Sequence, residues 1–125
     1  MAKEIIHTDD APKAVGPYVQ AVKTGGVIYC SGQLGLNPEN GKLCEGVEAQ
    51  AHQSLKNLGA VLKEAGSSYG KVIKTSIFLA DMDDFAVVNE VYKSYFDGEF
   101  PARSCVQVAK LPLGGLVEIE CIAEA

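Results

Sequence analysis

Two short segments in the last quarter of the sequence carry the side chains best suited to chemistry. Residues 100–106 place Arg103 and Cys105 two positions apart in a β-like run, so both side chains point to one face of a strand. A second β-like run, after a short loop, supplies Glu118 and Glu120. An arginine binds a carboxylate through two parallel hydrogen bonds, and a neighbouring carboxylate can orient or deprotonate a water. The two segments suggest a pocket in which water attacks a small carboxylic acid.

The relation between these two segments depends on strand register, which the sequence leaves open. A slip of one residue would move both glutamates to the face opposite Arg103. Periodicity alone favours Glu118 and Glu120 on the solvated face of an edge strand, and Arg103 fits a surface salt bridge about as well as a pocket. The apolar neighbours of Arg103, and a carboxylate pair one hairpin away, favour the pocket.

The composition predicts one globular domain over residues 1–125. The chain is 47% hydrophobic and 22% charged, with a formal net charge of −5. An acidic balance disfavours nucleic acid or an anionic membrane as partner, since both require a basic surface. No apolar run approaches the ~20 residues that span a bilayer. Met1–Glu4 leads directly into a strand-like segment without the apolar core of a signal peptide, so we expect a cytoplasmic protein.

The cysteines and histidines form no metal or redox motif. The four cysteines lack CxxC spacing and are expected to be free thiols in a reducing compartment: Cys30, Cys44, Cys105 and Cys121. A nucleophilic Cys105 would need a histidine base, and neither His7 nor His52 stands in a recognisable pairing or at metal-ligand spacing. The glycines form no nucleotide-binding pattern. We therefore expect no metal and no organic cofactor.

Hydrophobic periodicity predicts the elements that position these residues. An apolar stripe over residues 47–65 predicts a helix that Gly66 ends, and a second stripe runs from Phe85 towards Gly98, capped by Asp81 or Asp83. Strands are predicted at residues 3–7, 19–23, 27–31 and 72–79, and in the two segments described above. Gly25 and Gly26 predict a hairpin turn between the second and third of these strands.

The resulting order is β-β-β-α-β-α-β-β, an α+β fold with two helices on one face of the sheet. The other face stays open and partly apolar, for example through Val117, Ile119, Cys121 and Ala123 or through their counterparts. An exposed apolar sheet face usually finds a partner, so a homo-oligomer with a site at its subunit interface is expected.

Six segments, in unbroken order, resemble the signature segments of the RidA (YjgF-type) family of reactive intermediate deaminases: Gly16–Val22, Ser31–Gln33, Val72–Thr75, Asp84–Asn89, Phe100–Cys105 and Glu118–Glu120. The resemblance implies a chorismate-mutase-like fold with a mixed sheet, and a homotrimer with a central barrel and active clefts between subunits. It also implies hydrolysis of 2-imino acids, such as 2-iminopropanoate and 2-iminobutanoate, to 2-keto acids and ammonia.

The resemblance assigns roles to individual residues of this chain. It makes Arg103 the residue that binds the substrate carboxylate, and it selects Glu118 over Glu120 as the carboxylate associated with the hydrolytic water. Cys105 stands at a catalytic pocket position, where a nearby backbone group would help to hold the water. The remaining substrate-binding positions implied by the family are Tyr18, Ser31, Gly32 and Asn89.

The substrate class accounts for the absence of a cofactor in this interpretation. The C=N carbon of an imine is already electrophilic, so the protein has only to fix the carboxylate and aim a water. Such imines arise from pyridoxal-phosphate enzymes, and the resemblance implies a role in limiting metabolite damage. Two alternatives remain: an endoribonuclease or translation inhibitor, which the net charge disfavours, and a non-catalytic carboxylate-binding trimer. The pairing of Arg103 with Glu118 favours catalysis, since binding needs only the arginine.

Overall fold

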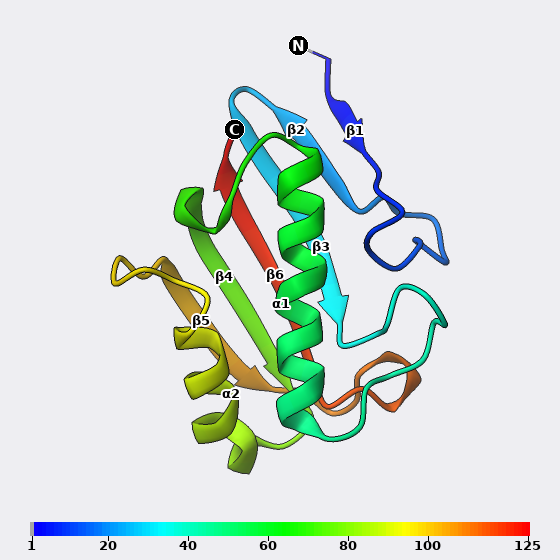
Figure 1. The fold of residues 1–125 in the computed structure, drawn as a ribbon, viewed down its shortest axis with the longest axis vertical. Helices are drawn as coiled ribbons and strands as arrows, with labels where there is room; N and C mark the ends of the chain where they lie inside the picture. The colour runs from blue at the N-terminus through cyan, green and yellow to red at the C-terminus, as the bar shows by residue number, and fades with distance from the viewer. Residues whose placement is uncertain (1) are drawn as a thin grey trace.

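The computed structural model describes residues 2–125, in which six strands form one sheet and two helices cover one of its faces (Figure 1). The elements follow the predicted order β-β-β-α-β-α-β-β, disregarding three single turns of 3-10 helix. Their bounds are β1 Glu4–Ile6, β2 Ala21–Thr24, β3 Val27–Leu34, α1 Val47–Glu64, β4 Val72–Leu79, α2 Phe85–Lys93, β5 Ala102–Gln107 and β6 Val117–Glu124. Neither α1 nor α2 is apolar over a length that could cross a membrane.

The sheet is mixed, and its strands lie in the order β1-β2-β3-β6-β4-β5. The β2–β3 hairpin turns on Gly25 and Gly26, whose φ angles of 57° and 79° match the two left-handed positions of a tight type I′ turn. β4 and β5 are parallel, and parallel neighbours need a crossover, which α2 supplies. In the sheet β4 lies between β5 and β6, so these two strands do not pair with each other. The expectation that a single hairpin joins the arginine and glutamate segments is therefore wrong.

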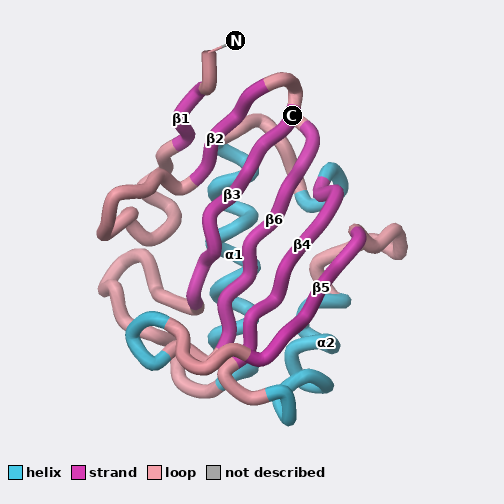
Figure 2. The backbone as a smooth tube through the Cα atoms, turned by 180° about the vertical axis from the view of Figure 1, so that it is seen from behind, coloured by secondary structure: helices cyan, strands magenta, loops and turns pink. Residues whose placement is uncertain are grey.

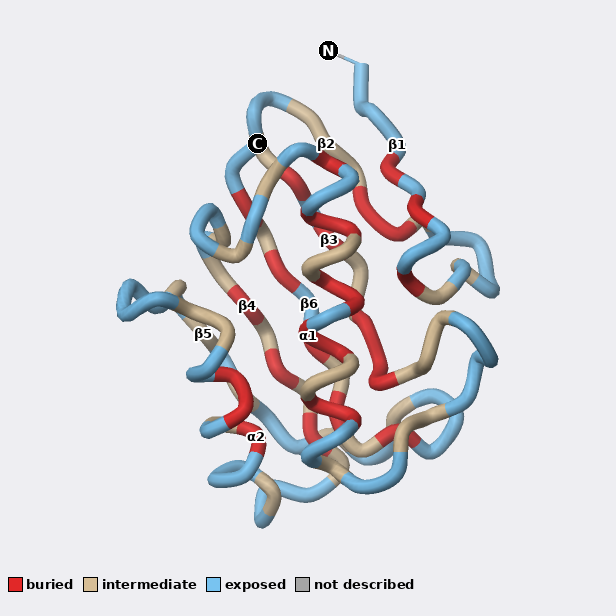
Figure 3. The backbone as a smooth tube through the Cα atoms, viewed as in Figure 1, coloured by how far each residue is buried: buried red, intermediate tan, exposed pale blue. Residues whose placement is uncertain are grey.

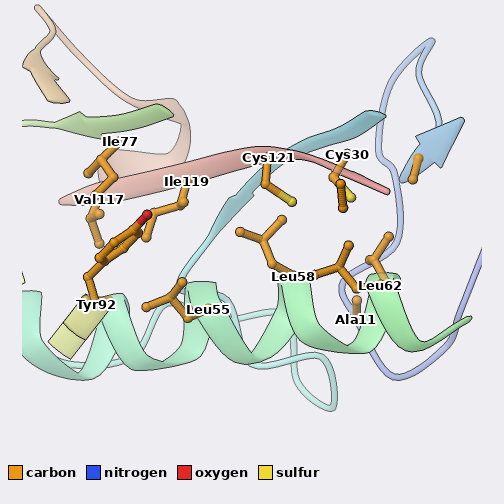
Figure 4. Close-up of a cluster of buried hydrophobic side chains, with 14 of the residues drawn as sticks. Ala11, Cys30, Leu55, Leu58, Leu62, Ile77, Tyr92, Val117, Ile119 and Cys121 are labelled. Atoms are coloured by element: carbon orange, nitrogen blue, oxygen red, sulfur yellow. The ribbon is translucent and has the colours of Figure 1, made fainter. Parts of the chain in front are cut away.

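The core lies between the sheet and the helices (Figure 3). On α1, buried positions recur every three or four residues, as in Leu55, Leu58 and Leu62, and they pack against inward residues of the central strands (Figure 4). Gly66, with a φ of 83°, follows the end of α1 as predicted. α2 ends at Lys93, earlier than its apolar stripe indicated. Asp81 accepts a hydrogen bond from the Asp83 backbone N–H in the turn that leads into α2.

The second face of the sheet carries no helix (Figure 2), but its residues differ from the expected ones. The four residues given as examples for that face are all buried against the helices: Val117, Ile119, Cys121 and Ala123. Alternation along β6 puts Glu118 and Glu120 on the open face instead. Alternation defines two sets of side chains, and the wholly apolar set faces the core because glutamates are costly to bury. Tyr29 and Val106, 49% and 46% exposed, supply apolar surface on the open face.

Candidate functional site

Arg103 projects from the edge strand β5 onto one side of α2. Its Nη1 donates a hydrogen bond of 2.7 Å to Oδ1 of Asn89. Its Cζ lies 5.0 Å from the ring centroid of Tyr92 and 5.5 Å from that of Phe85, within the range of cation–π contact. Phe85, Asn89 and Tyr92 are spaced by four and three residues, so they share one side of the helix. The guanidinium is thus held in a fixed position by three side chains of α2.

Phe85 and Tyr92 contact Arg103, although aromatic residues at this helical spacing predict the core stripe of a helix. Tyr92 is indeed buried, and its hydroxyl shares a hydrogen bond of 2.7 Å with Oγ1 of Thr75 on β4. Phe85 is 39% exposed and lies outside the core. The detectable signal was the combination of aromatic residues at helical spacing with an arginine on the strand that follows in the same crossover.

The guanidinium of Arg103 forms no salt bridge within residues 2–125. It lies instead at a cavity of about 340 Å³ that is also lined by Asn89, Tyr92, Phe100 and Pro101. A partly buried cation without a counter-ion favours an anionic ligand, since the ligand restores the charge interaction lost on desolvation. The sequence left open the alternative that Arg103 forms a surface salt bridge. The structure shows no such salt bridge within residues 2–125.

Glu118 lies in a second cavity, of about 420 Å³, which Tyr18 and Gly32 also line. A β-bulge shapes this part of β3: Cys30 pairs with Cys121 and Gln33 with Ile119, so Ser31 and Gly32 lie opposite Glu120 alone. A Cβ atom on Gly32 would stand 2.9 Å from Cδ of Glu118. The missing side chain therefore gives the glutamate room to lie over the bulge.

The pKa of Glu118 is raised above its usual value of 4.5, first by burial and then by the charge of Glu120. Burial disfavours the charged carboxylate, and a like charge close by adds to the cost of ionisation. A carboxylate with a raised pKa is a stronger base than an exposed one. Glu118 is therefore suited to accept a proton from a bound water.

Backbone-directed hydrogen bonds hold the segment that carries Tyr18 beside this cavity. The side chain of Gln20, 2% exposed, accepts from the Thr8 backbone N–H at 2.7 Å and donates to the carbonyls of Thr8 and Pro12 at 3.0 and 2.9 Å. The hydroxyl of Ser31 donates to the carbonyl of Val19 at 2.6 Å. No role was predicted for Gln20 itself, although it lies in the signature segment Gly16–Val22. Its contribution is to fix an irregular loop that has few ladder hydrogen bonds of its own.

Cys105 lies two residues beyond Arg103 and pairs with the core residue Ile77, so it shares the helix-covered face of the sheet. Burial raises the pKa of its thiol, although Arg103 acts in the opposite direction. A thiol with a raised pKa stays protonated at neutral pH, and the thiolate is the reactive form. This environment does not create a nucleophile.

Six of the seven predicted site residues fall into two groups on opposite faces of the sheet, and the seventh, Ser31, lines neither cavity. Arg103 and Cys105 lie on the helix-covered face with Asn89, whereas Tyr18, Gly32 and Glu118 line the other cavity. A single pocket containing both Arg103 and Glu118 is not formed within one chain, which corrects the simplest interpretation of the sequence. The physical reason is the placement of β4 between β5 and β6, together with the inward alternation of Val117 and Ile119.

Comparison with known proteins gives consistent full-length matches. Residues 8–125 match the family model described as Endoribonuclease L-PSP. A mouse protein named 2-iminobutanoate/2-iminopropanoate deaminase is 54% identical over 122 residues, 97% of this chain and 90% of the relative.

Solved structures agree with the sequence matches. RidA from the Antarctic bacterium Psychrobacter sp. is 50% identical with a TM-score of 0.96, covering 98% of this chain and 99% of that one. Escherichia coli TdcF, solved with bound serine, is 46% identical with a TM-score of 0.95, covering 98% of each chain. The fold, the order of the signature segments and these matches agree: the chain belongs to the RidA (YjgF/L-PSP) family.

Proposed function

We propose that this chain hydrolyses reactive 2-imino acids, such as 2-iminopropanoate and 2-iminobutanoate, to 2-keto acids and ammonia. The observation that carries the proposal is Arg103, a guanidinium fixed by α2 at a cavity and without a salt bridge in residues 2–125. Relatives named as deaminases of these two imino acids support it. So does the serine bound to TdcF, because serine carries a carboxylate and a nitrogen on the adjacent carbon, as an imino acid does.

The reaction needs no chemistry beyond side chains and water. Arg103 binds the substrate carboxylate. With the carboxylate held there, the C2–N double bond lies beside Glu118. Glu118 accepts a proton from the water as the water oxygen bonds to C2, and passes that proton to the imine nitrogen, which gives a carbinolamine. Glu118 then takes the proton of the carbinolamine hydroxyl and delivers it to the nitrogen as the C–N bond breaks, so ammonia leaves and the oxygen becomes the carbonyl of the keto acid. The raised pKa of Glu118 suits a group that first accepts and then returns a proton.

We propose that the site is completed between subunits of a homotrimer with a chorismate-mutase-like arrangement. Arg103 and Glu118 lie on opposite faces of one sheet, so an arginine of one subunit can meet a glutamate of the next only across an interface. The open face, with Tyr29 and Val106 exposed, would form the central barrel. Light scattering should give three times the 13.2 kDa chain mass. A monodisperse monomer at micromolar concentration would rule out both the trimer and the shared site.

Residues 1–125 would act as one catalytic domain in the cytoplasm, removing imines released by pyridoxal-phosphate enzymes. Within residues 2–125 no group of three or more His, Cys, Asp or Glu residues could hold a metal ion.

The ribonuclease activity in the family description is the second candidate function. The net charge of −5 disfavours it, because binding to a phosphate backbone needs a basic surface.

A coupled assay tests the proposal directly. An amino-acid oxidase generates the imine from alanine or 2-aminobutanoate, and keto acid release is followed with and without this protein. We expect faster release with the wild-type chain, and no acceleration with Arg103→Ala at unchanged melting temperature. Unchanged release with wild-type protein would refute the proposal. Binding of 2-oxobutanoate without any acceleration would favour the non-catalytic carboxylate-binding trimer instead.

A further inference from the structure

The cavity that contains Glu118 is mostly apolar beyond the glutamate. Its walls come from three separate loops together with the end of β3 and Glu118 of β6, and only Glu118 and Lys13 among its lining residues are charged. The apolar lining includes Val15 from the first loop, Leu36 and Pro38 from the second, and Pro112 and Leu113 from the third. An apolar enclosure with one reactive polar group is the usual form of a site that binds an apolar ligand and acts on one of its ends.

The cavity is larger than the smallest proposed substrate requires. Its volume is about 420 Å³. A molecule such as 2-iminopropanoate occupies the space of a few waters, each with about 30 Å³ of liquid volume. Space for a longer substituent on C2 therefore remains between Glu118 and the apolar walls.

Leu113 has an unusual conformation at this cavity. Its φ and ψ of 60° and 15° place it in the left-handed region, which a residue with a Cβ atom rarely adopts. Its side chain is 70% exposed, so burial in its own chain contributes little to offset the strain. Glycine or asparagine would adopt this turn at lower cost. A strained, exposed leucine at a cavity is consistent with a contact to a ligand.

We propose that Leu113, together with Leu36 and Pro112, binds the side chain of the imino acid and makes the protein prefer substrates with apolar substituents longer than ethyl. This inference rests on the proposed deaminase function and concerns the same site. Glu118 lies beside C2 of the substrate, and the substituent on C2 extends along the cavity wall that contains Leu113. Leu113 is thus a residue that determines specificity, and it takes no part in the chemical step.

The test compares kcat/KM for the imine made from leucine with kcat/KM for the imine made from alanine. Leu113→Ala removes the side chain but keeps a Cβ atom in the left-handed region. Leu113→Gly removes both the side chain and the strain. We expect both variants to lower the leucine-to-alanine ratio about tenfold, the size of effect that loss of an apolar contact produces in a specificity pocket. Leu113→Met keeps a long apolar side chain and should retain most of the wild-type leucine-to-alanine ratio of kcat/KM.

Melting temperature separates ligand contact from backbone strain. Leu113→Gly should melt about 2–4 °C higher than Leu113→Ala, since only glycine relieves the left-handed conformation. Val87→Ala is the matched control: Val87 is 41% exposed on α2, is not among the residues lining this cavity, and should leave the ratio unchanged. An unchanged ratio in both Leu113 variants, with the alanine-derived imine still hydrolysed, would overturn the assignment of Leu113. If the wild-type protein hydrolyses none of the imines, the proposed deaminase function would instead be overturned.

Discussion

Arg103 and Glu118 lie on opposite faces of one sheet, with the whole of β4 between their strands. Arg103 is level with Thr75, which faces the helices, and Glu118 is level with Phe78, whose neighbours on β4 are buried on the helix side. If both residues serve one reaction, two chains must supply them. This geometry gives the first prediction.

Mixing two inactive variants should restore activity. Arg103→Ala and Glu118→Gln are each expected to lose at least about 100-fold in kcat/KM, a barrier increase of roughly 3 kcal/mol. In trimers reassembled from equal amounts of both, about a quarter of the interface sites would combine an intact Arg103 with an intact Glu118. The measurement is the deaminase rate after co-refolding. No gain over the separate variants, despite confirmed subunit exchange, would show that each site draws on a single chain.

Glu118→Gln should stabilise the fold at neutral pH. The pKa of Glu118 is raised by burial and by Glu120, so the folded state binds this proton more tightly than the unfolded chain. Stability is therefore lost as the pH rises from near 4.5 through the raised pKa, and glutamine has no such dependence. Melting temperatures of the wild type and of Glu118→Gln should be measured from pH 4 to 8. They should coincide at the acid end, and at higher pH the variant should have the higher melting temperature. Glu120→Gln, at an exposed position, should keep near-normal turnover at pH 7.

Asn89→Asp should weaken substrate binding more than Asn89→Ala. Oδ1 of Asn89 accepts a hydrogen bond from Arg103 at 2.7 Å, so an aspartate there would pair with the guanidinium and compete with the substrate carboxylate. We expect KM to rise about tenfold or more with a smaller change in kcat. Asn89→Ala loses the hydrogen bond but leaves the positive charge free, and its KM should rise less. Equal KM values for the two variants would contradict a carboxylate-binding role for Arg103.

Gly32→Ala should impair turnover by displacing Glu118. The added Cβ would lie 2.9 Å from Cδ and 3.0 Å from Cγ of that side chain, which is flexible enough to move aside. We expect a fall in kcat of about 10- to 100-fold at a stability cost of about 1 kcal/mol or less. Gly70→Ala is the control, because the nearest neighbour of the added Cβ would be Oγ of Ser68 at 3.8 Å, an ordinary van der Waals distance. Normal kinetics in Gly32→Ala would show that the position of Glu118 does not matter.

Cys105→Ser should retain much of the activity. Burial raises the pKa of the thiol, which therefore stays protonated, and the imine needs no covalent intermediate. Mass spectrometry of enzyme quenched during turnover should find no adduct on Cys105. An adduct, or complete loss of activity in a folded Cys105→Ser variant, would make the cysteine a nucleophile.

The sequence predicted the local structure well because local structure depends on local patterns. The apolar stripe and Gly66 predicted α1, and Gly25 and Gly26 predicted the β2–β3 turn. The orientation of β6 could not be predicted this way. Its alternation is compatible with either face pointing inward, and the choice depends on helices that are distant in sequence.

The candidate site could be named from the sequence as a set of residues but not as an arrangement. Arg103 and Glu118 could be named from chemistry and resemblance, yet their placement on opposite faces follows from strand order, which the sequence does not encode locally. The contacts of Phe85 and Tyr92 with Arg103 were missed because apolar residues at helical spacing usually indicate a core. The role of Gly32 depends on a single distance across two strands, and no sequence pattern contains that information.

The position of β6 in the sheet also constrains how the chain folds during synthesis. β6 follows every other strand in sequence but pairs with both β3 and β4, at the centre of the sheet. Until residues 117–124 leave the ribosome, β1–β3 and the β4–β5 pair are two fragments, each with an unpaired edge. Unpaired edges of this kind promote aggregation of nascent chains. Completion of the sheet, and with it of the Glu118 cavity, must therefore wait until β6 has emerged and can pair with β3 and β4.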